Sequence, residues 1–233
     1  MDAIVDLAPG ADANRAVVVM LPGAGDRARD LVQHGFVHAL RKRGLVVDAR
    51  ILDAHVGYYL DRDLTRRMER EVIAPLRAAA SVRIWLLGIS LGGMGALAYL
   101  RGHAKTIAGV VLIAPFLGTQ GLVAEVERAG GLDEWQPGPI ASNNDERQML
   151  AWLRHYRADD SEYPPIFLAY GAEDRLRAAS MMLGARLPAD RVLTAPGGHD
   201  WVTWRTLWER LLDTCLSLGA ASPRAPAIGE GRA

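Results

Sequence analysis

The sequence of 233 residues has very little cysteine and no excess of charge of either sign. Its single cysteine, Cys215, excludes an internal disulfide and a zinc site built from cysteine pairs. Its 27 Lys and Arg residues balance 27 Asp and Glu residues, so no net charge favours binding to phosphate backbones or anionic membranes. We therefore expect neither nucleic acid nor a membrane among its partners.

Long hydrophobic runs are also missing. No apolar stretch approaches the roughly 20 residues that cross a bilayer. Residues 1–14 lack the basic start and apolar core of a signal peptide. These absences predict a cytoplasmic protein. Half of the residues are nevertheless apolar, which is enough for one large domain with a substantial core.

Short apolar runs alternate with amphipathic segments along the chain. The runs predict strands at residues 16–21, 45–52, 83–88, 109–114, 165–170 and 191–195, and the segments between and after them predict helices at 28–43, 62–79, 93–101, 145–157, 176–186 and 201–218. This alternation indicates an α/β fold with a doubly wound, mostly parallel sheet. The charged run at 61–71 is typical of an exposed helix face with i,i+4 ion pairs.

The domain organisation follows from two further segments. Residues 116–163 are longer than a plain crossover and contain loop-like Pro, Gly and Asn clusters, which predicts a small cap within a single domain of residues 1–218. Residues 219–233 are rich in Ala, Pro and Gly without periodicity, which predicts disorder.

A Gly-x-Ser-x-Gly motif stands between a predicted strand and a predicted helix. The central residue is Ser90, flanked by Gly88 and Gly92. A serine on so sharp a strand-to-helix turn crowds its neighbours, so small residues are needed two positions before and after it. The order is that of a nucleophile elbow.

An acid and a histidine follow at the ends of later predicted strands. Asp174 follows the strand at 165–170, and His199 follows the strand at 191–195. Because the carboxyl ends of parallel strands share one edge of the sheet, both side chains are expected beside Ser90. His199 would act as general base, with Asp174 holding its imidazole in one tautomer. Glu173 and Asp200 are the alternative acids.

Acyl transfer at Ser90 also needs N–H donors for the developing oxyanion. We expect one from the backbone of Leu91, at the start of the next helix, and the second from Ala24 in the loop after the first predicted strand. The same loop permits another interpretation. Gly23, Gly25 and Ala28 match G-x-G-x-x-A, and Asp48 could be a ribose-binding acid, which would indicate an NAD(P)-binding oxidoreductase.

On the Ser90 and His199 motifs, the chain resembles the α/β-hydrolase superfamily over most of residues 16–218. The segments at 88–97 and 197–204 are similar to motifs of an esterase branch that includes carboxylesterases and acyltransferases. The Pro-Gly-Ala-Gly-Asp loop at 22–26 is similar to that of small carboxylesterases, phospholipases and thioesterases, although many relatives carry His-Gly where this chain has Pro22-Gly23. The resemblance implies a serine hydrolase that needs no cofactor.

Apolar residues near these motifs are candidates for the wall of a substrate pocket. They include Met94, Phe116, Trp135 and Trp201, although Trp201 also fits a helical stripe that packs on the sheet. No His cluster indicates a metal site. The sequence thus predicts hydrolysis of a small-molecule carboxylic ester or thioester. An acyltransferase with the same three residues and a non-catalytic binding module remain alternatives, separable by product analysis and by Ser90→Ala.

Overall fold

A mostly parallel sheet forms the centre of the molecule. The structure is a computed structural model, and it describes residues 1–10, 16–79 and 82–218. In this part of the chain the strands are β1 (Ala3–Asp6), β2 (Ala16–Leu21), β3 (Val47–Leu52), β4 (Arg83–Ile89), β5 (Gly109–Ile113), β6 (Ile166–Gly171) and β7 (Val192–Ala195). Their order is β1-β3-β2-β4-β5-β6-β7. Strands β2 to β7 are parallel, and β1 pairs antiparallel with β3 at one edge.

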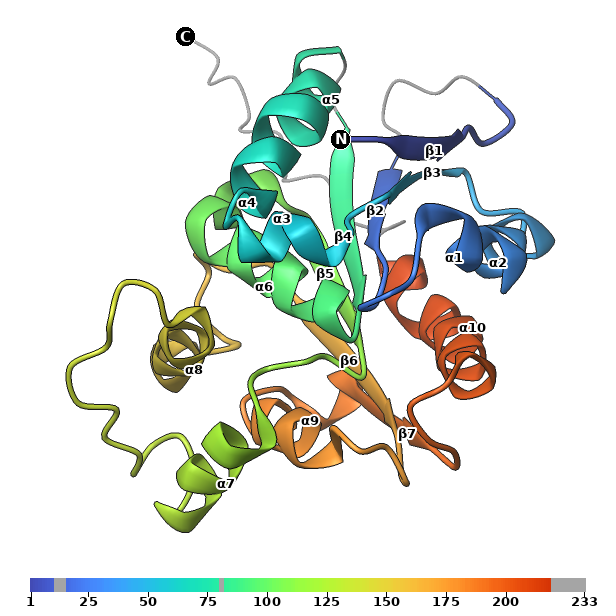
Figure 1. Cartoon of the computed structure of the whole chain (residues 1–233). Coiled ribbons are helices and arrows are strands. Elements are labelled where there is room, and N and C mark those ends of the chain that lie inside the picture. The colour runs from blue at the N-terminus through green and yellow to red at the C-terminus, as the bar shows by residue number, and fades with distance from the viewer. Residues whose placement is uncertain (11–15, 80–81, 219–233) are drawn as a thin grey trace, which may run out of the picture.

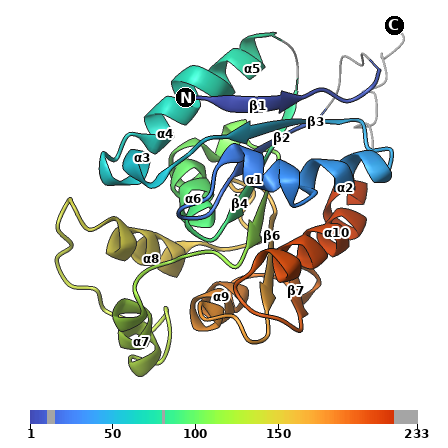
Figure 2. The same ribbon diagram turned by 45° about the vertical axis from the view of Figure 1, so that its right-hand side comes forward.

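Both faces of the sheet are covered by helices (Figures 1 and 2). On one face lie α1 (Ala28–Gln33), α2 (Phe36–Lys42) and α10 (Trp201–Leu218). On the other side of the sheet lie α3 (Val56–Leu60), α4 (Leu64–Arg67), the π-helix Met68–Ile73, α5 (Ala74–Ala79), α6 (Leu91–His103), α8 (Asp145–His155) and α9 (Arg177–Gly184), with α7 (Gln120–Arg128) outermost. Short 3-10 turns occupy Ala104–Thr106 and Ala189–Arg191.

Side-chain alternation along the central strands explains the two-layered core. In β2, Val17 and Leu21 face the core beneath α6, whereas Val18 and Met20 face the core beneath α1, α2 and α10. Successive side chains of a strand point to opposite faces, so a strand covered on both sides must be apolar at every position. All six residues of β2 are buried. The predicted α/β fold with a mostly parallel sheet is therefore confirmed.

Several elements differ from the sequence-based expectation. The edge strand β1 was not predicted because its side chains are largely exposed and carry little apolar pattern. The helix expected at 28–43 is broken into α1 and α2 at Gly35, whose φ is +84°. The helix expected at 62–79 contains a π-helical turn, and α3 and α7 form where no helix had been predicted. The disorder expected at 219–233 lies outside the described residues.

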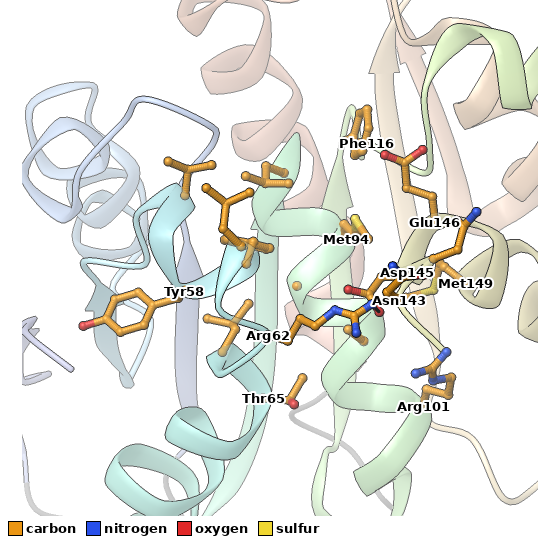
Figure 3. Close-up of a pocket in the computed structure, with 18 residues that line it drawn as sticks. Tyr58, Arg62, Thr65, Met94, Arg101, Phe116, Asn143, Asp145, Glu146 and Met149 are labelled. Carbon is orange, nitrogen blue, oxygen red and sulfur yellow. Dashed lines mark hydrogen bonds and ion pairs between the residues drawn. The ribbon is translucent and has the colours of Figure 1, made fainter. Parts of the chain in front are cut away.

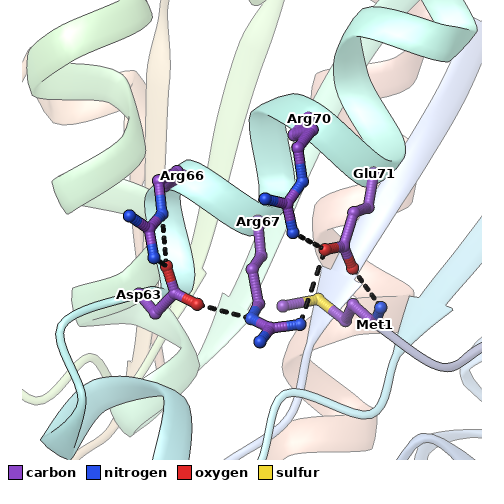
Figure 4. Close-up of polar contacts among 6 residues, drawn as sticks. All are labelled: Met1, Asp63, Arg66, Arg67, Arg70 and Glu71. Carbon is purple, nitrogen blue, oxygen red and sulfur yellow. Dashed lines mark hydrogen bonds and ion pairs between the residues drawn. The ribbon is translucent and has the colours of Figure 1, made fainter.

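The charged run at 61–71 forms the ion-paired helix face that its spacing predicts (Figure 4). Asp63 accepts hydrogen bonds from Arg66, at 2.6 Å, and from Arg67, while Arg67 also lies 3.4 Å from the Glu71 carboxylate. The Met1 amino group and Arg70 also donate to Glu71. These donors lower the pKa of Glu71 to about 2.

Candidate active site

The strand order changes direction between β2 and β4. After β2 the chain moves outward to β3, whereas β4 lies on the opposite side of β2 and the chain then continues through β5, β6 and β7. Loops that leave two such strands separate to opposite faces and open a crevice at the carboxyl edge of the sheet. The loop at 22–26 and Ser90 both lie at this point. The topology therefore selects this edge as the place for a site.

Ser90 stands at the turn between β4 and α6 in a strained conformation. Its φ is +51° and its ψ is −116°, a region that residues with a side chain rarely adopt. The turn is held because Ser90 N–H donates to the Ile113 carbonyl at 3.0 Å, and the Ser90 carbonyl accepts from Phe116 N–H at 2.8 Å. Ser90 itself is only 8% exposed.

The two flanking glycines are required by space. A Cβ on Gly88 would lie 2.3 Å from the carbonyl oxygen of Gly92, and a Cβ on Gly92 would lie 2.2 Å from the carbonyl oxygen of Leu21. Both obstacles are backbone atoms, which cannot rotate away. The need for small residues on each side of Ser90, inferred from the motif, is thus explained by direct backbone packing.

Ser90, His199 and Asp174 are brought together by the ends of β4, β6 and β7. His199 Nε2 lies 3.0 Å from Ser90 Oγ. His199 Nδ1 lies 3.0 Å and 2.9 Å from the two carboxylate oxygens of Asp174. Leu176 N–H donates to Asp174 Oδ1 at 2.7 Å, which fixes the carboxylate, and Asp174 is 5% exposed. The three side chains form one continuous line of hydrogen bonds.

The two alternative acids have other partners. Glu173 accepts a hydrogen bond from Gly197 N–H and so fastens the loop that leads to His199. Asp200 accepts from Thr203 N–H at 2.9 Å in the first turn of α10. This backbone hydrogen bond is the main reason that the pKa of Asp200 is lowered. Of the three acids, Asp174 is therefore the one whose carboxylate holds the imidazole.

The loop after β2 lies directly against the elbow. A Cβ on Gly23 would be 3.5 Å from Ser90 Cβ, and the carbonyl oxygens of Leu21 and Pro22 press on Gly92. Ala24 follows at the exposed tip of this loop. Leu91 is the first residue of α6, where the backbone N–H has no partner within the helix. Both residues expected to supply oxyanion donors thus lie on segments that border Ser90.

Asp26 is an acidic residue of the site to which sequence reasoning assigned no role. A Cβ on Gly23 would lie 2.8 Å from Asp26 Oδ2, which places this carboxylate close to the Ser90 side of the loop. Burial is the largest cause of the raised pKa of Asp26, followed by repulsion from Asp30, while His34 and His199 oppose the rise. The sequence signal was only an acid beside a glycine-rich loop.

A cavity of about 570 Å³ opens beside the elbow (Figure 3). Met94 and Phe116, both predicted as pocket residues, line it together with residues of α3 and α8. Trp135 and Trp201 do not line it. Trp135 is buried and donates from Nε1 to Glu125 at 2.9 Å, and Trp201 stacks on His34 with ring centres 4.2 Å apart. Trp201 thus packs against the core, as the helical stripe of α10 allowed, whereas the packing of Trp135 had no sequence signal.

The dinucleotide-binding interpretation fails at Asp48. This residue is the second of β3 and therefore lies near the amino edge of the sheet, away from the loop at 22–26. Asp48 is 2% exposed and accepts a hydrogen bond from Ala8 N–H at 2.9 Å. A ribose-binding acid would have to stand at the carboxyl edge, so Asp48 cannot take that role.

The described residues contain neither a cluster of metal ligands nor a membrane-spanning helix. No group of three or more His, Cys, Asp and Glu residues among them is arranged to hold a metal ion. None of the helices within the described ranges is both long enough and apolar enough to cross a membrane.

The fold and the Ser90 edge together define an α/β hydrolase. The model of the α/β-hydrolase family matches residues 18–230, and the chain belongs to that family. No curated protein matches the sequence. The structure is similar to that of Est1E from Butyrivibrio proteoclasticus, with 16% identity, coverage of 94% of each chain and a TM-score of 0.63.

Two further solved structures show the same fold. The fluorophosphonate-binding serine hydrolase F (FphF) of Staphylococcus aureus shares 14% identity over 91% of this chain and 90% of its own, with a TM-score of 0.61. An S-formylglutathione hydrolase from Agrobacterium tumefaciens shares 16% identity over 91% and 87%, with a TM-score of 0.60. At these identities the likeness extends to the fold alone.

Proposed function

We propose that the protein is a serine hydrolase that cleaves a carboxylic ester or thioester through an acyl-enzyme on Ser90. The observation that carries this proposal is the hydrogen-bonded line from Ser90 through His199 to Asp174 at the carboxyl edge of the sheet. A serine hydroxyl is a weak nucleophile at neutral pH, and an oriented imidazole within hydrogen-bond distance is what activates it.

The first half of the reaction follows from these distances. His199 Nε2 removes the Oγ proton as Ser90 Oγ bonds to the substrate's carbonyl carbon. The carbonyl electron pair moves to oxygen, where the Leu91 and Ala24 N–H groups stabilise it. The intermediate then collapses: the bond to the alcohol or thiol breaks, and His199 returns its proton to the leaving group. Asp174 stabilises the imidazolium throughout.

Water completes the cycle in the same way. His199 takes a proton from water as its oxygen attacks the acyl carbon, and the bond to Ser90 Oγ breaks when the proton is returned to Oγ. A carboxylic acid is released and the enzyme is regenerated. No redox partner or metal is needed for any of these steps.

We further propose that residues 116–163 act as a cap that completes the substrate cavity within one domain. Phe116 begins this segment, and Met149 of α8 contributes to the cavity wall. Thr119 N–H donates to Glu146 at 2.8 Å, which ties the start of the segment to the first turn of α8. Among the similar structures, the names Est1E, serine hydrolase and S-formylglutathione hydrolase agree with ester or thioester chemistry here.

Covalent labelling tests the proposal directly. The wild-type protein should react with a fluorophosphonate probe and hydrolyse nitrophenyl esters or acyl thioesters of graded chain length. Ser90→Ala should abolish labelling and reduce turnover by about 10⁶-fold, as in other serine hydrolases. Ser180→Ala is the matched control, because the Ser180 hydroxyl is buried in α9 without a partner in the described part of the chain. Labelling and turnover that persist in Ser90→Ala would overturn the assignment.

A further inference from the structure

The cavity beside Ser90 follows one face of α6 along most of its length. Leu91, Met94, Gly95, Ala98 and Arg101 line it at intervals of one, three or four residues. With a rise of 1.5 Å per residue, the backbone from Leu91 to Arg101 spans roughly 15 Å. The cavity is therefore elongated, with Ser90 beside one end and Arg101 at the other.

Part of the cavity lining suits an apolar chain. The apolar residues of the lining include Met94, Phe116, Leu64 and Met149, and the last two are buried in the core. Gly95 also lines the cavity, and a larger side chain there would collide with its neighbours, because a Cβ would lie 2.7 Å from both Leu64 Cδ2 and Tyr59 Oη. Apolar surface of this kind favours hydrocarbon over polar groups.

The cavity lining also carries two arginines, and one of them, Arg101, stands at its far end. Figure 3 shows Arg101 at the end opposite Phe116, with Arg62 and Asp145 between them. Arg62 is paired with Asp145 at 3.0 Å, so these two charges largely cancel. Glu146, the remaining acid of the lining, accepts the Thr119 N–H.

Arg101 is a charged residue of the cavity lining that has no ion-pair partner among the described residues. No carboxylate of the described residues lies within ion-pair distance of it, although the same residues supply pairs for Arg62, Arg66, Arg67, Arg70 and Arg77. Arg101 stands in the last turn of α6, and its exposed side chain lines the cavity. A guanidinium binds a carboxylate with two parallel hydrogen bonds.

We propose that Arg101 binds a carboxylate at the distal end of the acyl chain, so that the substrates are esters or thioesters of ω-carboxylated acids. This inference rests on the proposed function. The reacting carbonyl lies at Ser90, the hydrocarbon chain lies along Met94 and Ala98, and the terminal carboxylate meets Arg101. The favoured chain is the one whose length matches the distance between Ser90 and the guanidinium.

Paired substrates test this specificity. The kcat/KM of nitrophenyl half-esters of succinate, adipate, suberate and sebacate would be compared with that of the corresponding simple acyl esters. One of the longer half-esters should exceed its uncharged partner in wild type, and 0.5 M salt should weaken that preference because salt screens an exposed charge. Arg101→Gln should reduce the preference, measured as the ratio of kcat/KM for the half-ester to that for its uncharged partner, about tenfold.

Arg83→Gln is the matched control. Arg83 is also exposed and without an ion-pair partner among the described residues, but it begins β4, roughly 20 Å along the strand from Ser90. It should leave the preference unchanged. The proposal is overturned if simple acyl esters are favoured at every length, or if Arg83→Gln and Arg101→Gln reduce the preference equally.

A binding experiment separates this inference from the proposed function. Calorimetric titration of the wild-type protein with suberate and with octanoate requires no turnover. Tighter binding of suberate that is lost in Arg101→Gln supports the carboxylate site even if no ester is hydrolysed. Equal binding of the two acids, or binding unaffected by Arg101→Gln, overturns it while leaving Ser90 chemistry intact.

Discussion

Gly92, two residues after Ser90, packs against the backbone of Leu21, at the end of β2. A Cβ on Gly92 would fall 2.2 Å from the Leu21 carbonyl oxygen and 2.6 Å from that of Pro22. The elbow and the loop after β2 are therefore positioned by the same contact. A change at Gly92 should disturb the serine and its neighbouring loop together.

Gly92→Ala is expected to destabilise the fold by about 3 kcal/mol and to abolish activity, because overpacking against backbone cannot be relieved by a side-chain rotation. Urea unfolding and esterase assays measure the two effects. Gly102→Ala is the control in the same helix: a Cβ there meets no atom within 4 Å, so stability should rise by about 0.5–1 kcal/mol. Equal stability losses in the two variants would refute this account.

Asp174→Asn should lower kcat by about 10⁴-fold with little change in stability, since an amide no longer holds the imidazole tautomer that accepts the serine proton. Steady-state kinetics and a thermal melt check this expectation. Glu173→Gln and Asp200→Asn should remain within about tenfold of wild type, because both acids bond to backbone N–H groups rather than to His199. A larger loss in either control would reassign the acid.

The raised pKa of Asp26 gives a pH-dependent effect on stability. Burial, the main cause of the shift, disfavours the charged carboxylate in the folded protein, so stability is lost as pH rises from 3.8 through the higher pKa of the folded state. Asp26→Asn should therefore melt at a higher temperature than wild type at pH 7, and this advantage should vanish below pH 3.8. The exposed Asp61→Asn is the control; a pH-independent gain at Asp26 would contradict the mechanism.

Gly35→Ala should cost about 1–2 kcal/mol, because the φ of +84° between α1 and α2 is unfavourable for any residue with a Cβ. Urea denaturation would measure the loss. Gly121→Ala in α7 should be neutral or stabilising, since a Cβ there meets no atom within 4 Å and its φ is not positive. An unchanged free energy of unfolding in Gly35→Ala would contradict this explanation of the break between α1 and α2.

The sequence predicts the parts of this fold in which local pattern and burial agree. Continuous apolar runs locate all six parallel strands because each lies between two helical layers. The strand β1 escapes detection because it is an exposed edge held by backbone pairing with β3. Gly35 is visible as a glycine, but its positive φ is not, so one helix was expected where two occur.

The candidate site likewise has a part that the sequence predicts and a part that it does not. Ser90, Asp174 and His199 are found from the sequence because each lies in the turn or loop that follows a strand, and the parallel topology brings strand ends together. The cavity depends on packing between α6, α3 and α8, which are far apart in sequence. Arg101 and Trp135 could not be sorted into cavity and core without those contacts, because periodicity places a residue on a helix face but does not identify the opposing surface.

The segment between β5 and β6 is inserted at a single place in the chain, although β5 and β6 are neighbours in the sheet. It supplies Phe116, Met149 and the Asp145 partner of Arg62 to the cavity, yet none of Ser90, Asp174 or His199. Evolution can therefore replace this one stretch and alter which molecules are accepted while the reacting groups stay in place. A graft of this stretch onto a related hydrolase would carry these wall residues with it but leave behind the α6 side of the cavity, including Arg101.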